Sequence, residues 1–309
     1  MKILVTGGAG FIGSHVVDGY VRDGHDVIVI DDLSTGFKRN IHRRARFYKI
    51  DIRDSAIREV FAREKPEIVN HHAAQMDVRK SVDDPLFDAD VNIMGSLNIL
   101  KSSIDSGAKK FIYISSGGAV YGEPRYLPVD EEHRINPNCQ YGISKHTVEH
   151  YLALHSELDG LPYTVLRYPN VYGPRQNPYG EAGVNAIFIG QMLRDEPCTI
   201  FGDGEQVRDY VYIDDIVDAN RMVLEKGNNE IYNLGSQKGT SVNEIHDRLK
   251  RLIGSKRHAI YGSSRKGEIT EIYLNTAKVR RELGWAPQVG LEEGMKRTID
   301  FFRDNLGFF

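Results

Sequence analysis

The sequence GGAGFIG at residues 7–13 joins an apolar run, Lys2–Thr6, to a helical pattern, Gly13–Asp23. A connection this short and this rich in glycine brings a strand and a helix into close contact. A second apolar run, His25–Ile30, follows the helix. Strands joined through a helix lie parallel, and a parallel sheet is covered on both faces. The start of the chain therefore favours an α/β fold built on a parallel sheet.

The alternation of strand and helix continues as far as Tyr168, which predicts a doubly wound parallel sheet. Further strands are expected at Arg46–Lys49, Phe111–Ser115 and Tyr163–Tyr168. Another strand is expected to start at Glu67–Asn70. Helices are expected at Asp54–Glu64, Asp84–Ser106, Gln140–Leu158, Asn185–Arg194 and Asp214–Glu225. The segment Pro169–Tyr179 is rich in Pro, Gly, Asn and Tyr, so it is expected to form a loop.

The regular alternation of strand and helix ends after Tyr168, which predicts two domains. The larger is expected to hold the sheet and to comprise residues 1–168 with about 209–227, a segment that returns to it. The smaller is expected to be an α/β substrate-binding domain made of residues 169–208 and 228–309.

Composition excludes several classes of protein. The net charge of −3 lacks the basic excess typical of nucleic-acid-binding domains. No apolar run approaches the roughly 18 residues that a membrane span needs, and MKILVTGG lacks the pattern of a signal peptide. Cys139 and Cys198 lie 59 residues apart without a CxxC pair, so neither a disulfide framework nor a metal site is expected. A reducing cytoplasm is the expected location.

The three glycines of the first turn have separable tasks in a dinucleotide site. Gly7 allows the tight turn, and Gly13 allows the helix to pack closely on the strand. Gly10 lets the backbone approach a pyrophosphate, which would lie at the positive end of the following helix. The pattern therefore predicts a dinucleotide cofactor at this turn.

An acidic residue at the end of the second strand indicates which dinucleotide is bound. Asp31 lies 21 residues after Gly10, where a carboxylate accepts hydrogen bonds from a ribose 2′-hydroxyl and repels a 2′-phosphate. NAD is therefore favoured over NADP. The alternative is that Lys38 and Arg39 meet a 2′-phosphate.

Tyr141 and Lys145, in the sequence YGISK, lie four residues apart on an expected helix and so project from one face. A phenol is a poor base at neutral pH, but a neighbouring cation favours the phenolate. Such a pair suits the removal of a hydroxyl proton while a hydride leaves the same carbon. Ser115 and Ser116, at the end of the fifth strand, are candidates to share that proton.

Beyond these motifs, several blocks resemble one family along nearly the whole chain. They include HHAAQMDVRKSVDDP, SSGGAVYGEP, LRYPNVYGPRQ, FGDGEQVRDYVYIDDIVDA and YNLGSQKGTSVNEI. The chain resembles the extended short-chain dehydrogenases/reductases of the nucleotide-sugar class, which form the NAD-dependent epimerase/dehydratase family. The resemblance implies a Rossmann sheet, bound NAD, a UDP-sugar substrate and epimerisation at C4 of the sugar.

The resemblance also implies residue roles. Cofactor contacts are expected from Gly7, Gly10, Phe11, Ile12, Gly13, Asp31, Asp32, Asp51, Ile52, Ala73, Ala74, Asn92, Tyr141, Lys145 and Tyr168. Substrate contacts are expected from Ser116, Tyr141, Asn170, Phe201, Arg208, Arg265 and Glu268. The two arginines suit diphosphate oxygens, which they can bind through charge-assisted, bidentate hydrogen bonds.

One position departs from the family pattern. Many family epimerases use a third hydroxyl residue before VYG, and Gly117 stands there in this chain. Ser116 is then the nearest hydroxyl and is favoured over Ser115 as the catalytic serine. The family's 4,6-dehydratases carry an Asp-Glu pair in this loop, whereas Gly117, Gly118 and Ala119 supply no acid for elimination.

Three alternatives to the favoured epimerase remain. Ile272 lies near the position that limits sugar size in the family, so an N-acetylated UDP-sugar is one alternative substrate. A 4,6-dehydratase and a non-catalytic NAD-binding sensor are the others. The resemblance further implies a homodimer, formed by the helices at Asp84–Ser106 and Gln140–Leu158.

Overall fold

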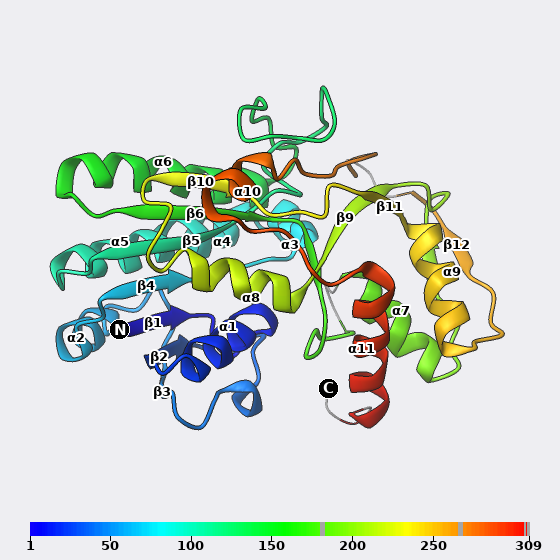
Figure 1. Cartoon of the computed structure of the whole chain (residues 1–309), viewed down its shortest axis with the longest axis horizontal. Helices are drawn as coiled ribbons and strands as arrows, with labels where there is room; N and C mark the ends of the chain where they lie inside the picture. The colour runs from blue at the N-terminus through cyan, green and yellow to red at the C-terminus, as the bar shows by residue number, and fades with distance from the viewer. Residues whose placement is uncertain (180–182, 265–267, 306, 308–309) are drawn as a thin grey trace.

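The computed structural model describes residues 1–179, 183–264, 268–305 and 307 (Figure 1). Its centre is a seven-stranded sheet in the order β10-β6-β5-β4-β1-β2-β3. The strands are β1 Lys2–Thr6, β2 Asp26–Asp31, β3 Arg46–Lys49, β4 Ile68–His71, β5 Lys110–Ser116, β6 Tyr163–Tyr168 and β10 Glu230–Asn233. All neighbouring pairs are parallel, which confirms the expected doubly wound α/β fold.

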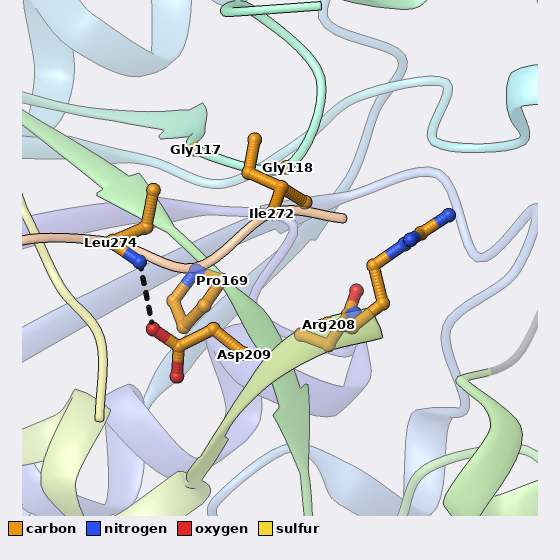
Figure 2. A pocket seen from close by; sticks show the side chains of 8 residues that line it. Gly117, Gly118, Pro169, Arg208, Asp209, Ile272 and Leu274 are labelled. Atoms are coloured by element: carbon orange, nitrogen blue, oxygen red, sulfur yellow. Dashed lines mark hydrogen bonds between the residues drawn. The ribbon is translucent and has the colours of Figure 1, made fainter. Parts of the chain in front are cut away.

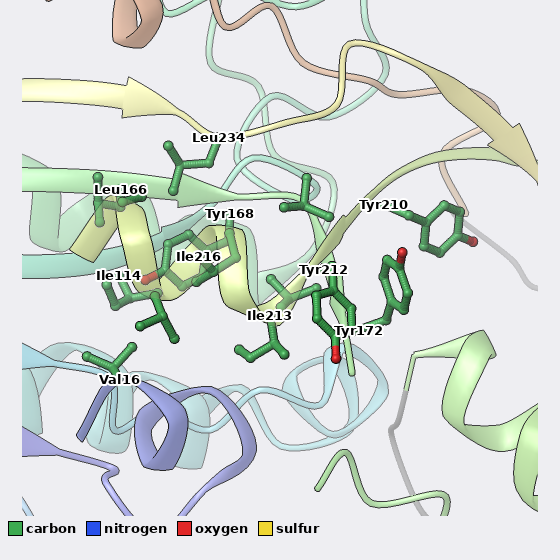
Figure 3. Close-up of a cluster of buried hydrophobic side chains, with 14 of the residues drawn as sticks. Val16, Ile114, Leu166, Tyr168, Tyr172, Tyr210, Tyr212, Ile213, Ile216 and Leu234 are labelled. Atoms are coloured by element: carbon green, nitrogen blue, oxygen red, sulfur yellow. The ribbon is translucent and has the colours of Figure 1, made fainter. Parts of the chain in front are cut away.

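The apolar runs become strands because their side chains are buried on both faces of the sheet. Alternate residues of a strand point to opposite faces. In β1, Ile3 and Val5 belong to one core cluster, whereas Leu4 belongs to another. Figure 3 shows part of the first cluster, where Val16, Leu166 and other apolar side chains meet. The sheet therefore separates two apolar layers.

Helices cover both layers (Figure 1). The first layer packs on α1 Phe11–Arg22 and α8 Ile213–Met222, and the second on α2 Ile57–Glu64, α5 Ser96–Asp105 and α6 Gln140–Asp159. The short helices α3 Val78–Asp83 and α4 Pro85–Ala89 precede α5. No helix in the described part of the chain is long and apolar enough to cross a membrane.

The helix expected at Asp84–Ser106 is interrupted. α4 leads into a π-helical turn, η2 Asp90–Gly95, before α5 begins. Asn92, at the centre of this turn, is buried and donates to Asp88 Oδ1 over 3.0 Å and to the Gln75 carbonyl over 2.9 Å. A π-helical turn is confined to a single turn within a helix, which is too short for a hydrophobic pattern to locate.

A second group of elements extends beyond the large sheet. The small sheets pair β7 Asn170–Tyr172, β9 Val207–Tyr212 and β11 Gly239–Ser241, and β8 Thr199–Phe201 with β12 Ile260–Gly262. The accompanying helices are α7 Val184–Leu193, α9 Val242–Ile253 and α11 Leu291–Asp304, whereas α10 Ala277–Leu283 lies against β10 of the large sheet. The expected loop at Pro169–Tyr179 was therefore wrong in part, because β7 lies within it and pairs with β9.

The expected domain boundary at residue 228 needs one correction. Strand β10, residues 230–233, pairs in parallel with β6 and completes the large sheet, although it was assigned to the smaller domain. Its sequence, EIYN, is too short to show a strand pattern, and its two buried residues, Tyr232 and Asn233, gain their partners only from the folded sheet. The rest of the domain division remains a prediction.

Candidate functional site

The glycine turn after β1 is as tight as its sequence predicts. Gly7 has φ +68°, and a Cβ there would lie 2.7 Å from the backbone nitrogen of Ala73. A Cβ on Gly13 would lie 2.2 Å from the Gly7 carbonyl oxygen. Gly10 is the N-cap residue of α1. Because glycine has no side chain, no capping side chain accepts a hydrogen bond from the first amides of the helix. This cradle fits the pyrophosphate of a dinucleotide.

Asp31 is held beside this turn. Its carboxylate accepts hydrogen bonds from the Ala9 amide over 2.9 Å and from the Leu33 amide over 2.8 Å. Burial raises its pKa, and these two hydrogen bonds oppose the rise. A carboxylate has lone pairs left for ribose hydroxyls. Asp32 is exposed and accepts hydrogen bonds from the amide and hydroxyl of Ser34.

The neighbouring strand ends supply the other expected cofactor residues. Asp51 accepts from the side chain of Arg53, while Ile52 is buried against Gly95. Ala73 lies against Gly7 and donates its amide to Thr6 Oγ1 over 3.1 Å. Further expected cofactor residues are Phe11, Ile12 and Ala74, which are half-buried, and Asn92, which holds the loop after β4 through Gln75. Most of these residues thus lie along one edge of the sheet, at the carboxyl ends of β1, β2 and β4.

Tyr141 lies close to Ser116. Burial raises the pKa of Tyr141, the neighbouring Cys139 adds to the rise, and a hydrogen bond with Ser116 opposes it. Lys145 lies one helical turn further along α6 and is 3% exposed. Burial lowers its pKa to about 8, although Asp88 and Glu149 oppose this shift. The three expected groups therefore meet between β5 and the first turns of α6.

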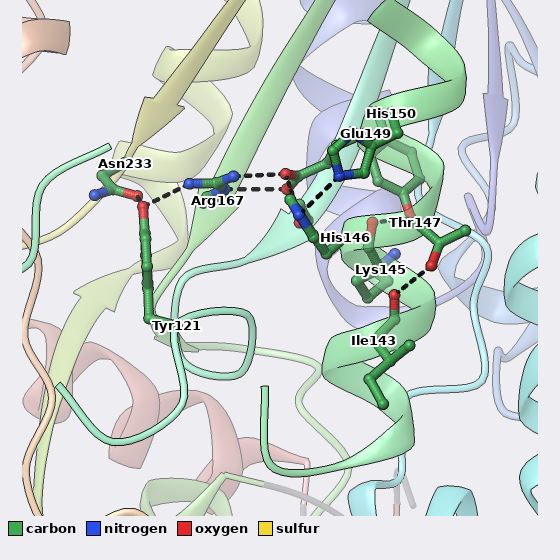
Figure 4. A network of polar contacts seen from close by, with 11 residues as sticks. Tyr121, Ile143, Lys145, His146, Thr147, Glu149, His150, Arg167 and Asn233 are labelled. Atoms are coloured by element: carbon green, nitrogen blue, oxygen red, sulfur yellow. Dashed lines mark hydrogen bonds and ion pairs between the residues drawn. The ribbon is translucent and has the colours of Figure 1, made fainter. Parts of the chain in front are cut away.

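Ser115 faces elsewhere. Its hydroxyl donates to Glu149 Oε1 over 2.6 Å, and the same carboxylate receives hydrogen bonds from Arg167. Figure 4 shows this carboxylate between α6 and β6. The hydroxyl of Ser115 is thus taken up by Glu149, which lies two helical turns from Tyr141 along α6, whereas Ser116 is the last residue of β5. The geometry favours Ser116 for a contact with substrate.

A small pocket lies at Gly117 and Gly118, in the loop that follows β5 (Figure 2). Its lining residues are Gly117, Gly118, Pro169, Asn170, Arg208, Asp209, Ile272 and Leu274. Two expected substrate residues, Asn170 and Arg208, are thus brought together. Asp209 links two segments at this pocket, because it accepts hydrogen bonds from the Leu274 amide over 3.1 Å and from the Ser236 amide over 2.8 Å.

Among the described residues that line this pocket, Arg208 is the positively charged one. Burial lowers its pKa, and Glu268 opposes the shift with its Oε1 at 3.5 Å from Arg208 Nη2. Glu268 therefore lies near the pocket as the partner of Arg208. Arg265, the second arginine expected at the diphosphate, lies outside the described residues. Phe201 is on β8 and is 37% exposed, and it is not among the lining residues of this pocket.

The side chain of Tyr168 does not reach the cofactor cradle. Its phenol is buried in the first core cluster and accepts a hydrogen bond from Asn220 Nδ2 over 2.6 Å. Its backbone carbonyl accepts from the Gly117 amide over 2.8 Å, so its contact with the candidate site is through the main chain.

Sequence reasoning missed two buried polar groups without a hydrogen-bond partner among the described residues. Asn185, in the otherwise apolar start of α7, is 1% exposed, and neither polar atom of its amide has a partner among the described residues. His72 Nε2 is also buried without a partner in the described chain, and burial, aided by the charge of Lys145, lowers the pKa of His72 to about 3. An unpaired polar group in a buried position is costly. The asparagine in VNAIFIG was the visible signal for the first of these.

Comparisons with known proteins agree with this geometry. A sequence model of the NAD dependent epimerase/dehydratase family matches residues 3–235. The chain is 41% identical to a UDP-glucose 4-epimerase of Mycolicibacterium smegmatis, covering 98% of this chain and 99% of the relative. A UDP-glucose 4-epimerase of Thermotoga maritima, solved with UDP-glucose, is 51% identical, with a TM-score of 0.98 over 99% of this chain and 100% of that one.

A third relative has another substrate in its name. A UDP-N-acetylglucosamine 4-epimerase of Methanobrevibacter ruminantium, solved with UDP-N-acetylmuramic acid, is 33% identical, with a TM-score of 0.93 over 98% of both chains. The family match spans the glycine turn and the strand ends around it, which confirms NAD as the expected cofactor. The chain belongs to the NAD dependent epimerase/dehydratase family.

Proposed function

We propose that this protein is a UDP-glucose 4-epimerase, which interconverts UDP-galactose and UDP-glucose. The observation that carries the proposal is that the buried Lys145 lies one helical turn from Tyr141 on α6, with Ser116 close by at the end of β5, and that the pocket with Arg208 begins at the next residue, Gly117. The similarity to UDP-glucose 4-epimerases along nearly the whole chain supports the same substrate.

In this proposal Tyr141 removes the proton from the 4-hydroxyl of the sugar, and Ser116 hydrogen-bonds the same oxygen. When bound, NAD supplies the acceptor for the C4 hydride and a positive charge that favours the phenolate. Lys145 adds a second positive charge one helical turn away and is suited to hold the nicotinamide ribose. Because the hydride returns to the opposite face of the 4-keto sugar, the reaction involves no net redox change.

The pocket would anchor the nucleotide while leaving the sugar free to turn. Arg208 is suited to the diphosphate, because a guanidinium binds phosphate oxygens through paired hydrogen bonds. Asn170 lies in the same pocket, and we add Asn185 as a further candidate because its buried amide lacks a partner among the described residues. Residues 169–208 and 228–309, without β10, are proposed to form the substrate-binding domain.

The proposal is tested by incubating the protein with UDP-galactose and NAD, without reductant, and separating the nucleotide sugars by chromatography. UDP-glucose should form until equilibrium is reached. Tyr141→Phe should lower turnover by about 10²–10⁴-fold while NAD still binds, because the phenolic oxygen is the proposed base. Normal turnover by this variant would remove the role assigned to Tyr141.

One observation favours a second candidate substrate, an N-acetylated UDP-sugar. Ile272 lines the pocket and is smaller than an aromatic residue, and one of the similar structures is a UDP-N-acetylglucosamine 4-epimerase. The ratio of kcat/KM for UDP-galactose and UDP-N-acetylgalactosamine separates the two. A kcat/KM for UDP-galactose well above that for UDP-N-acetylgalactosamine supports the proposed UDP-glucose 4-epimerase.

We also propose that the protein is a cytoplasmic homodimer. Apolar side chains are exposed on neighbouring helical segments. They are Leu86 on α4, Met94 in η2, and Ile143, Leu154 and Leu158 on α6. A patch of this kind is typical of a protein interface. Cys139 and Cys198 are buried free thiols, which suits a reducing compartment. Light scattering that gives the mass of one chain at working concentration would contradict the dimer.

A further inference from the structure

The short helix α4 carries a buried carboxylate. Asp88 is 1% exposed, and its Oδ1 accepts hydrogen bonds from Gln75 Nε2 over 3.1 Å and from Asn92 Nδ2 over 3.0 Å. Both donors are amides, so they carry no charge. Hydrogen bonds of this kind favour the ionised form of a carboxyl group. Asp88 is therefore a buried negative charge that its hydrogen-bond partners do not neutralise.

Asn92 connects this carboxylate to the helix that carries the catalytic pair. Its Nδ2 also lies 3.2 Å from the hydroxyl oxygen of Ser144, and the Ser144 hydroxyl donates to the Tyr141 carbonyl over 3.1 Å. Ser144 is buried on α6, directly before Lys145, and α4 packs on the same helix. Asp88 thus belongs to the buried surroundings of Tyr141 and Lys145.

Lys145 is the opposite charge in this region. It is 3% exposed, and its Nζ lies 4.7 Å from the centre of the Tyr113 ring. A buried ammonium group is costly unless an opposite charge compensates it. Glu149 lies one turn further along the same helix, but Arg167 already binds its carboxylate (Figure 4). Asp88 is the described neighbouring carboxylate without such a cation.

The rings around Lys145 supply no negative charge. His71, at the end of β4, and His72, directly after it, are buried, and burial together with the charge of Lys145 lowers the pKa of both. On β5 and α6, burial raises the pKa of Tyr113 and of Tyr141. All four rings are therefore neutral at neutral pH, and compensation of the ammonium charge has to come from a carboxylate.

We propose that Asp88 is a positioning residue for the reaction, the counter-charge that keeps Lys145 protonated in its buried place. This role rests on the proposed function, in which the positive charge of Lys145 favours the phenolate of Tyr141. Burial lowers the pKa of Lys145 to about 8, and the charges of Asp88 and then Glu149 oppose this shift. Without the charge of Asp88, Lys145 loses its proton at a lower pH and no longer favours the phenolate.

The test is an NMR titration of the full-length protein labelled with ¹³C at the lysine Cε atoms, with and without saturating NAD. The signal of Lys145 is assigned by its absence from Lys145→Met. Asp88→Asn keeps the shape and the hydrogen-bond acceptor but removes the charge, so the pKa of Lys145 should fall by about one unit or more.

Asp90→Asn is the matched control. Asp90 lies two residues further along the chain, but its side chain is 53% exposed and its carboxylate is paired with Arg53 over 2.7 Å. Exposure and pairing both weaken its effect on a buried group. This variant should therefore leave the pKa of Lys145 unchanged.

Steady-state kinetics provide a second measurement. The charge of Asp88 raises the pKa of both Tyr141 and Lys145, so the whole pH profile of kcat should move to lower pH in Asp88→Asn. The KM for UDP-galactose should change less than kcat, because Asp88 is not among the residues that line the pocket. A general loss of packing would not move the pH profile in this way.

Circular dichroism checks folding, and Asp88→Ser, which also keeps an acceptor without the charge, replaces Asp88→Asn if that variant is unfolded. An unchanged pKa of Lys145 in the folded variant would overturn the proposal, as would an equal fall in Asp90→Asn. The NMR result does not depend on turnover. A lowered pKa of Lys145 together with no conversion of UDP-galactose by the wild type would support the counter-charge and contradict the proposed function.

Discussion

A Cβ atom on Gly117 would lie 2.4 Å from Cδ1 of Leu274, so the loop after β5 and the segment that carries Leu274 meet without room for a side chain. The space that a side chain at position 117 would need is therefore filled by an apolar side chain from another part of the chain. Leu274 is itself fixed, because its amide donates to buried Asp209.

Gly117→Ala should destabilise the protein by about 1–3 kcal/mol through overpacking against Leu274. Gly118→Ala is the control, because a Cβ there has its nearest neighbour at 3.9 Å, the Ser116 Oγ. Urea unfolding measures both. Equal stability of the two variants would show that the contact with Leu274 is not tight. Leu274→Ala should relieve the overpacking in Gly117→Ala. The double variant should therefore lose less stability than the sum of the losses in the two single variants.

Ser116→Ala should lower kcat by about tenfold to a hundredfold, because a hydrogen bond to a group that becomes charged is lost. Ser115→Ala should instead lower the free energy of unfolding by about 1 kcal/mol through the loss of its hydrogen bond to Glu149, with a smaller effect on kcat. Steady-state kinetics and urea unfolding of both variants separate the two roles. A larger kcat loss in Ser115→Ala would reverse the assignment.

The large sheet was predictable because its apolar strands and its glycine turn are local features of the sequence. Strand β7 and strand β10 were not, since each is short and gains its partner from a segment far away in the chain. The site divides in the same way. The spacing of Tyr141 and Lys145 is local, whereas the choice between Ser115 and Ser116 depends on the hydrogen bond that Ser115 makes with Glu149, 34 residues away in the chain. The unpaired amide of Asn185 could be recognised only once its surroundings were known.

Asp31→Ala should weaken NAD binding by about tenfold or more, because it removes the acceptor for ribose hydroxyls and leaves the Ala9 and Leu33 amides unpaired. Asp32→Ala is the matched control, since Asp32 is exposed and turned toward Ser34. Titration of NAD into cofactor-free protein measures both affinities. Equal losses in the two variants would contradict the role given to Asp31.

The free energy of unfolding should fall in acid through Glu149. Its folded pKa of about 2 lies below the ordinary value of 4.5, so its contribution is complete above pH 4.5 and is lost as the pH falls from 4.5 to 2. Glu149→Gln should be about 3 kcal/mol less stable at neutral pH, because it leaves the Arg167 charge buried and unpaired. Urea unfolding across this pH range should show a weaker dependence in the variant. A parallel dependence would contradict this assignment.

The central claim is that the hydride removed from C4 of the sugar returns to the same carbon while Tyr141 handles the proton. It is tested most directly with UDP-galactose that carries deuterium at C4, incubated with the protein and NAD in ordinary water and followed by NMR. The account predicts UDP-glucose that retains the deuterium at C4. UDP-glucose without deuterium at C4, a dehydrated 4-keto-6-deoxy product, or no conversion of UDP-galactose would contradict it.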